Sequence, residues 1–115
     1  MVRKVDFYHK VNGDCPVQEF LDSLSGKVAQ KVGWTLELIE NQRFVPAKCL
    51  EHLDDGIYEV RVKFGSDIFR ILCFFTGGNV VLLTHGFVKK TQKTPPGEID
   101  MAKKYRYSYQ RRYRI

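Results

Sequence analysis

Three short apolar runs, separated by turn residues, dominate the second half of the chain. They span residues 57–64, 68–75 and 80–87 and are rich in β-branched and aromatic side chains. A Gly-Ser-Asp turn follows the first run, and a Thr-Gly-Gly-Asn turn follows the second. Short runs of this composition, bounded by glycine, are typical of strands, so the pattern predicts an antiparallel meander of three strands.

Apolar residues at helical spacing predict two helices before the meander and one after it. Pro16 is favourable at a first helical position, and the apolar residues after it recur at i, i+3, i+4 and i+7 up to Leu24. A second helix is expected from about residue 27 to residue 41. Trp34 and Leu38 lie beside its apolar stripe, which suggests contact with a second surface. A third helix is expected over residues 98–112.

The remaining segments complete an α+β pattern. Residues 2–8 alternate loosely and should form a first strand, while residues 44–53 should be a loop leading into a short strand. The order β-α-α-β-β-β-α predicts one α+β domain over residues 1–115. We expect a twisted antiparallel sheet with two N-terminal helices and a C-terminal helix. Both early helices should cover one face, and the basic residues should occupy the other.

Charge divides the chain into two unlike halves. Residues 1–60 carry seven Lys and Arg against ten Asp and Glu, a net charge of −3, whereas residues 61–115 carry twelve against three, a net of +9. A basic half on a mildly acidic chain favours a polyanionic partner, with RNA or DNA ahead of a membrane. The alternative is a lysine-rich surface that serves solubility.

Cysteine usage and hydropathy exclude several classes of protein. Cys15, Cys49 and Cys73 are odd in number and show no Cys-x-x-Cys spacing, so neither a disulfide framework nor a zinc site is indicated. We expect no metal and no cofactor. The N-terminus lacks an apolar signal region, and no run approaches membrane-spanning length, so the expected location is cytoplasmic.

Arginine side chains suited to phosphate lie on the predicted meander. Strand alternation places Glu59, Arg61 and Lys63 on one face. Arg70 lies on the next strand, and its face depends on a register that the sequence leaves open. Because a guanidinium is planar and permanently charged, it can hold two phosphate oxygens. Arg61 and Arg70 are therefore expected to grip one phosphate if they share a face.

His85, near the end of the third run, is the natural candidate for a catalytic acid or base, because its unperturbed pKa is close to neutrality. The alternative is a hydrogen-bonded structural histidine. Glu59 is the second candidate for the base, with a surface ion pair to Arg61 as its alternative.

Three lysines follow His85 within eight residues. Lys89, Lys90 and Lys93 are expected, with Lys63, to bind RNA phosphates close to the reacting groups. The alternative is a solvated basic surface.

Three segments together resemble the RelE/ParE toxin superfamily. Residues 53–61 read LDDGIYEVR, residues 69–75 read FRILCFF, and residues 82–95 read LLTHGFVKKTQKTP. The last is similar to the third strand and loop of the HigB-like, phage-derived branch. The similarity extends over most of the chain and implies the toxin of a type II toxin–antitoxin system.

The resemblance also implies an activity and partners. RelE-like and HigB-like toxins are mRNA interferases, metal-independent endoribonucleases that cleave mRNA in the ribosomal A site and inhibit translation. A small antitoxin, HigA-like for this branch, neutralises them in a hetero-oligomer. The ParE branch instead inhibits DNA gyrase without cutting nucleic acid, and this non-catalytic function is the alternative. This chain has Glu59 and Arg61 where the RelE branch has lysines, and the tyrosine after the basic loop has no match. The general base therefore stays open between His85 and Glu59.

Overall fold

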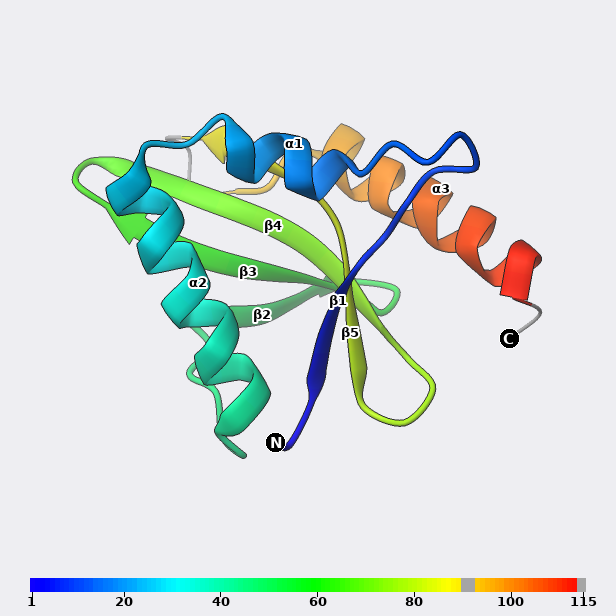
Figure 1. Cartoon of the computed structure of the whole chain (residues 1–115), viewed down its shortest axis with the longest axis horizontal. Helices are drawn as coiled ribbons and strands as arrows, with labels where there is room; N and C mark the ends of the chain where they lie inside the picture. The colour runs from blue at the N-terminus through cyan, green and yellow to red at the C-terminus, as the bar shows by residue number, and fades with distance from the viewer. Residues whose placement is uncertain (90–92, 114–115) are drawn as a thin grey trace.

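The computed structural model describes residues 1–89 and 93–113. Within them, three helices and five strands follow one another along the chain (Figure 1). Their bounds are β1 (Lys4–Phe7), α1 (Pro16–Asp22), α2 (Gly26–Asn41), β2 (Leu50–Asp54), β3 (Ile57–Phe64), β4 (Asp67–Thr76), β5 (Val80–Lys89) and α3 (Pro96–Tyr113). The predicted α+β class is confirmed, and each predicted helix starts within two residues of its expected position.

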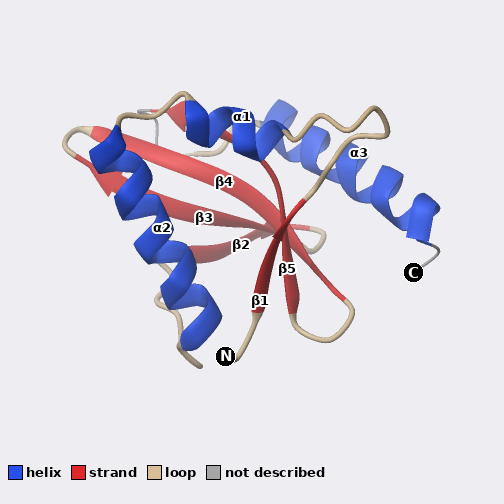
Figure 2. Ribbon diagram, viewed as in Figure 1, coloured by secondary structure: helices blue, strands red, loops and turns tan. Residues whose placement is uncertain are grey.

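The five strands form one sheet in the order β1-β5-β4-β3-β2. The predicted meander is present, since β3 pairs antiparallel with β4, and β4 with β5. The short strand expected before the meander is β2, which pairs with β3. One detail differs from the expectation: β1 lies parallel to β5, so the sheet is mixed rather than purely antiparallel. Parallel pairing needs a long crossover, which α1, α2 and the three intervening strands supply (Figure 2).

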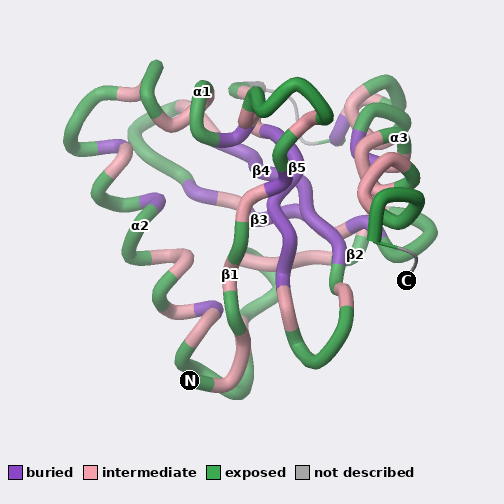
Figure 3. The backbone as a smooth tube through the Cα atoms, turned by 45° about the vertical axis from the view of Figure 1, so that its right-hand side comes forward, coloured by how far each residue is buried: buried purple, intermediate pink, exposed green. Residues whose placement is uncertain are grey.

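Each face of the sheet has its own apolar core. On one face, Val60, Val62 and Ile71 pack with Val17 of α1 and Val32 of α2. The opposite face packs against α3, whose Ala102 is fully buried against side chains of the central strands. These are Ile57, Leu72, Phe74 and Leu82. Because helices cover the sheet on both faces, β4 is a nearly continuous apolar run rather than an alternating one, and the buried segments converge on the middle strands (Figure 3).

The helix α1 lies against β5, and a glycine makes the close approach possible. A Cβ atom built on Gly86 would fall inside the van der Waals radius of the Phe20 ring. Any larger residue at this position would therefore push α1 away from the sheet.

The tyrosines of α3 hold it to the sheet. The ring of Tyr105 stacks on Tyr8 with centroids 4.9 Å apart, and the ring of Tyr109 meets Phe74 edge-on at 5.8 Å. Its basic residues add ion pairs to the β2–β3 turn, including Lys103 Nζ to Asp54 at 2.7 Å. None of the helices in residues 1–89 and 93–113 combines the length and apolarity needed to cross a bilayer.

Candidate functional site

The sheet register gathers the predicted site residues on the face that α3 partly covers. Arg61 stands directly opposite Arg70 on β3 and β4, which settles the face of Arg70. Two residues along β3, Glu59 faces Leu72, which in turn faces His85. Two residues in the other direction, Lys63 faces Ile68. Because side chains alternate between faces, these three alternate rows project to the same side.

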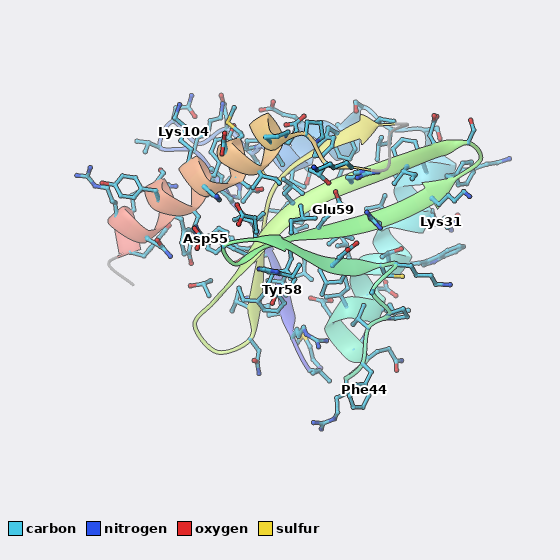
Figure 4. The ribbon with its side chains drawn as sticks, turned by 180° about the vertical axis from the view of Figure 1, so that it is seen from behind. Lys31, Phe44, Asp55, Tyr58, Glu59 and Lys104 are labelled. Carbon is cyan, nitrogen blue, oxygen red and sulfur yellow. The ribbon has the colours of Figure 1, made fainter. Side chains whose placement is uncertain are left out.

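Glu59 lies in the middle of this arrangement and is fully buried. Its Oε2 accepts a hydrogen bond from Arg61 Nε at 2.6 Å, and its Oε1 accepts one from Arg70 Nη1 at 3.3 Å. The hydroxyl of Thr94, just before α3, also donates to Oε1. Figure 4 shows Glu59 over the central strands on the face that carries α3. A carboxylate with three donors is fixed in position and has little capacity left to take a proton from a substrate.

The two arginines differ in their access to solvent. The side chain of Arg70 is fully buried, and its Nη1 also donates to Thr94 Oγ1 at 3.1 Å. The side chain of Arg61 is 30% exposed, and its Nη1 lies 3.0 Å from Oε2 of Glu51 on the edge strand β2. Arg61 is thus the arginine that an incoming phosphate can reach, and Arg70 lies behind it.

His85 is only 9% exposed and is fixed through both ring nitrogens. Its Nε2 lies 3.1 Å from Oε1 of Glu98 on α3, and its Nδ1 lies 3.1 Å from the hydroxyl of Thr84. The Tyr105 ring meets the imidazole edge-on at a centroid distance of 5.7 Å. Burial lowers the pKa of His85 below its usual 6.5, although the carboxylate of Glu98 acts in the opposite direction. At pH 7 the imidazole is therefore mainly neutral, the form that can accept a proton.

Two of the predicted RNA-binding lysines, Lys63 and Lys89, lie at the same end of the sheet. Lys63 and Lys93 are exposed. Lys89 is the last residue of β5, where the backbone register pairs it with Ile68. Lys90 lies outside the described residues. The exposed lysines and Arg61 therefore give this end of the sheet a cationic border.

Three residues of the site were not singled out by the sequence. Glu51 and Glu98 hold Arg61 and His85, and the Thr94 hydroxyl bonds to Glu59 and Arg70. The helix begins at Pro96, two residues after Thr94. For Glu51, the signal in the sequence was its expected position on the strand next to that of Glu59. For Glu98 and Thr94 the sequence held no such signal, because their contacts join distant segments.

The site offers no evident metal centre. Neither residues 1–89 nor residues 93–113 contain a group of three His, Cys, Asp or Glu side chains arranged to hold an ion.

A mixed sheet with paired helices on one face and a single helix on the other is consistent with the RelE-like fold. Residues 19–107 match the model of the family described as Phage derived protein Gp49-like (DUF891), and the chain belongs to this family. The family is part of the RelE/ParE-like toxin group, so the predicted membership in that group is confirmed. The narrower HigB-like assignment stays a prediction. No curated protein matches the chain.

Proposed function

We propose that the protein is the toxin of a type II toxin–antitoxin system and acts as a ribosome-dependent mRNA endoribonuclease. The chain belongs to a toxin-like family, and one structural observation carries the proposal. The face that bears Arg61 also brings Arg70 and His85 within two rows of the sheet, at an end bordered by exposed lysines. The arrangement provides a phosphate-binding cation beside a group able to move a proton.

The reaction requires three functions. A 2′-hydroxyl must lose its proton, the negative charge that develops on the phosphate must be stabilised, and the 5′-oxygen leaving group must be protonated. Stabilising the developing charge is usually the largest single contribution. In our proposal Arg61 contacts the scissile phosphate, because it is the more accessible arginine. Arg70 acts from behind, and with Glu59 it holds the Arg61 guanidinium in a fixed orientation.

His85 is proposed to move the proton. Its lowered pKa favours the neutral imidazole at pH 7, which is the form needed by a base that activates the 2′-hydroxyl. To reach the substrate, its ring must exchange the contact with Glu98 for one with the RNA. The lysines named in the sequence analysis, Lys63, Lys89, Lys90 and Lys93, would hold the mRNA in the ribosomal A site. None of these steps uses a metal ion.

A small antitoxin, HigA-like if the chain belongs to the HigB-like branch, would neutralise the toxin in a hetero-oligomer. Such a partner would mask the basic half of the chain, whose net charge is +9 over residues 61–115, from twelve Lys and Arg against three Asp and Glu. Electrostatic complementarity of this kind speeds association and excludes other partners.

The non-catalytic alternative has its own supporting observation. Glu59 and His85, the two candidate bases, are both buried and hydrogen-bonded. A ParE-like inhibitor would need a rigid cationic surface and no proton transfer, and the same bonds would serve it.

One experiment separates the two functions. The protein is induced in a bacterium, and RNA 5′ ends are mapped during growth arrest. The endoribonuclease predicts new ends inside translated codons, and cleavage by purified protein on ribosomes kept intact with polyamines should persist in EDTA. Growth arrest without new RNA ends, accompanied by inhibited gyrase, would support the alternative instead.

A further inference from the structure

A pocket of about 470 Å³ opens between α2 and the outer end of β3. Its charged lining residues, among those that the structure describes, are all basic: Lys31 from α2, Lys48 before β2, and Arg61 and Lys63 from β3. Arg61 and Lys63 are shared with the candidate site, whereas Lys31 and Lys48 are not. In Figure 4, Lys31 lies at the end of the sheet opposite to the end that carries Asp55.

The interior of the pocket is less polar than its rim. Cys49, Val62 and Ile68 contribute to its lining, together with the methylene stems of the lysines. A phosphate group is best held by several converging donors, whereas this pocket offers lysines around apolar atoms. It suits an apolar side chain with a carboxylate on either side.

The pocket lies beside an open strand edge. The pairing of β2 with β3 ends at Leu50 and Val60, but β3 continues to Phe64. Beyond the hydrogen bond from Arg61 N to Cys49 O, the outer edge of β3 faces the pocket rather than a strand. There the Lys63 carbonyl accepts a hydrogen bond from Lys31 Nζ at 2.5 Å. An extended peptide could continue the line of β2 and take over this acceptor, which is the general pattern of strand addition.

Two exposed aromatic residues flank this region. Trp34, the single tryptophan of the chain, is 61% exposed, and it lies on α2 one turn after Lys31 and next to Thr35, which lines the pocket. Phe64 is 39% exposed, with Lys31 Nζ 5.9 Å from its ring centroid. Exposed tryptophans beside a well-formed pocket are frequent anchors of protein interfaces. The sequence likewise suggests that Trp34 contacts a second surface.

We infer that this pocket and the adjoining edge of β3, together called the α2–β3 groove, bind an extended acidic segment of a protein partner. The segment inserts an apolar side chain between Lys31, Lys48 and Lys63 and places carboxylates against their ammonium groups. The identification of that partner as the antitoxin rests on the proposed function. The binding site itself rests on the groove.

The test uses the full-length protein and a defined probe. The probe is a fluorescein-labelled eight-residue peptide of alternating glutamate and valine, and its counterpart has lysine in place of glutamate. Measured by fluorescence anisotropy, the acidic peptide should bind at least about tenfold more tightly than the lysine peptide. Lys31→Glu and Lys63→Glu should each weaken binding of the acidic peptide by about tenfold or more, because like charges would then meet in the groove. Lys104→Glu on α3 is the matched control, because Lys104 is exposed and its substitution changes the net charge by the same amount.

The native cysteines show where the peptide binds. Cys49 lines the pocket, whereas Cys15, equally half-buried, lies at the start of α1 and packs against the core. Saturating acidic peptide should slow the alkylation of Cys49 by N-ethylmaleimide and leave that of Cys15 unchanged, as measured by mass spectrometry. The same protection is expected from the product of the adjacent gene if it is the antitoxin.

The outcomes that overturn the inference are distinct from failure of the toxin function. Equal weakening by all three charge reversals would indicate non-specific attraction to a basic protein. Protection of Cys49 by an eight-nucleotide oligouridylate but not by the acidic peptide would make the groove an RNA site. An unprotected Cys49 at peptide saturation would place the peptide elsewhere. None of these results depends on whether the protein cleaves mRNA.

Discussion

Arg61 and Arg70 stand directly opposite each other on neighbouring strands, yet both donate hydrogen bonds to one carboxylate, that of Glu59. Like charges at opposed positions of a sheet repel each other. Here the buried carboxylate between them compensates this repulsion and fixes both guanidinium groups. The arrangement of the cationic site therefore depends on an acidic residue.

Replacing Glu59 with Gln should strongly destabilise the fold. The substitution leaves the buried Arg70 without its counter-charge, and breaking a buried ion pair from one side typically costs about 3–5 kcal/mol. Glu51→Gln is the matched control, because Glu51 also binds Arg61 but its side chain is 43% exposed, and such pairs contribute about 0–1 kcal/mol. Urea unfolding measures both. Similar losses for the two variants would contradict the central position given to Glu59.

The two arginines should separate activity from stability. Arg61→Ala should lower the single-turnover cleavage rate on ribosomes by about 10²- to 10³-fold, as loss of one charge-stabilising donor typically does, with little loss of folding stability. Arg70→Ala removes a fully buried side chain that binds Glu59 and Thr94, so the variant should lose several kcal/mol of stability as well. A variant Arg61→Ala that keeps full activity would transfer the phosphate-binding role to another residue.

The sequence predicts much of the fold because the apolar residues carry the information locally. Runs of β-branched and aromatic residues bounded by glycine define the meander, and the spacing after Pro16 defines α1. The position of β1 is different. Its pairing with β5 joins residues more than seventy positions apart, and a loosely alternating segment does not reveal whether it pairs parallel or antiparallel.

The candidate site is predictable in its residue types but not in its connections. Alternation alone places Glu59 with Arg61, whereas the face of Arg70 depends on strand register. The contact between Glu59 and Thr94 spans 35 positions of the sequence. Burial is also a property of the whole fold, so the sequence could not show that Arg70 lies behind Arg61 rather than beside it at the surface.

His85 should give the protein a specific pH dependence. Its folded-state pKa is lowered, mainly by burial, so the unfolded chain binds more protons in the interval between that value and 6.5. Stability from this group is therefore complete above pH 6.5 and is lost as the pH falls through the interval. In urea unfolding from pH 5 to 8, the difference between the native protein and His85→Gln should change across that interval. His9 and His52, present in both proteins, cancel in the comparison.

The same lowered pKa makes a prediction for cleavage. If His85 is the general base, the single-turnover rate should be constant near pH 7 and fall about tenfold per pH unit below the lowered pKa, since only the neutral imidazole accepts a proton. His85→Gln should remove this fall in rate at acidic pH and reduce the rate on the order of 10²-fold or more.

A His85→Gln variant that retains the full rate and the same pH profile would exclude His85 as the base. Because Glu59 is buried and bonded to three donors, the base would then have to come from the ribosome or the RNA.

The contact between α1 and β5 gives a test of the fold that is independent of any activity. Gly86→Ala places a methyl group against the ring of Phe20, and overpacking of this kind typically costs about 1–3 kcal/mol. Gly77→Ala is the matched control, because Gly77 lies in the β4–β5 turn with no atom near the position of an added Cβ.

A smaller residue at position 20 should relieve the clash between the added methyl group and the Phe20 ring. The double variant Phe20→Leu with Gly86→Ala should therefore lose less stability than the sum of the two single variants, with a coupling of about 0.5–3 kcal/mol in a double-mutant cycle followed by urea unfolding. Additive losses would mean that α1 does not approach β5 as closely as Phe20 and Gly86 require.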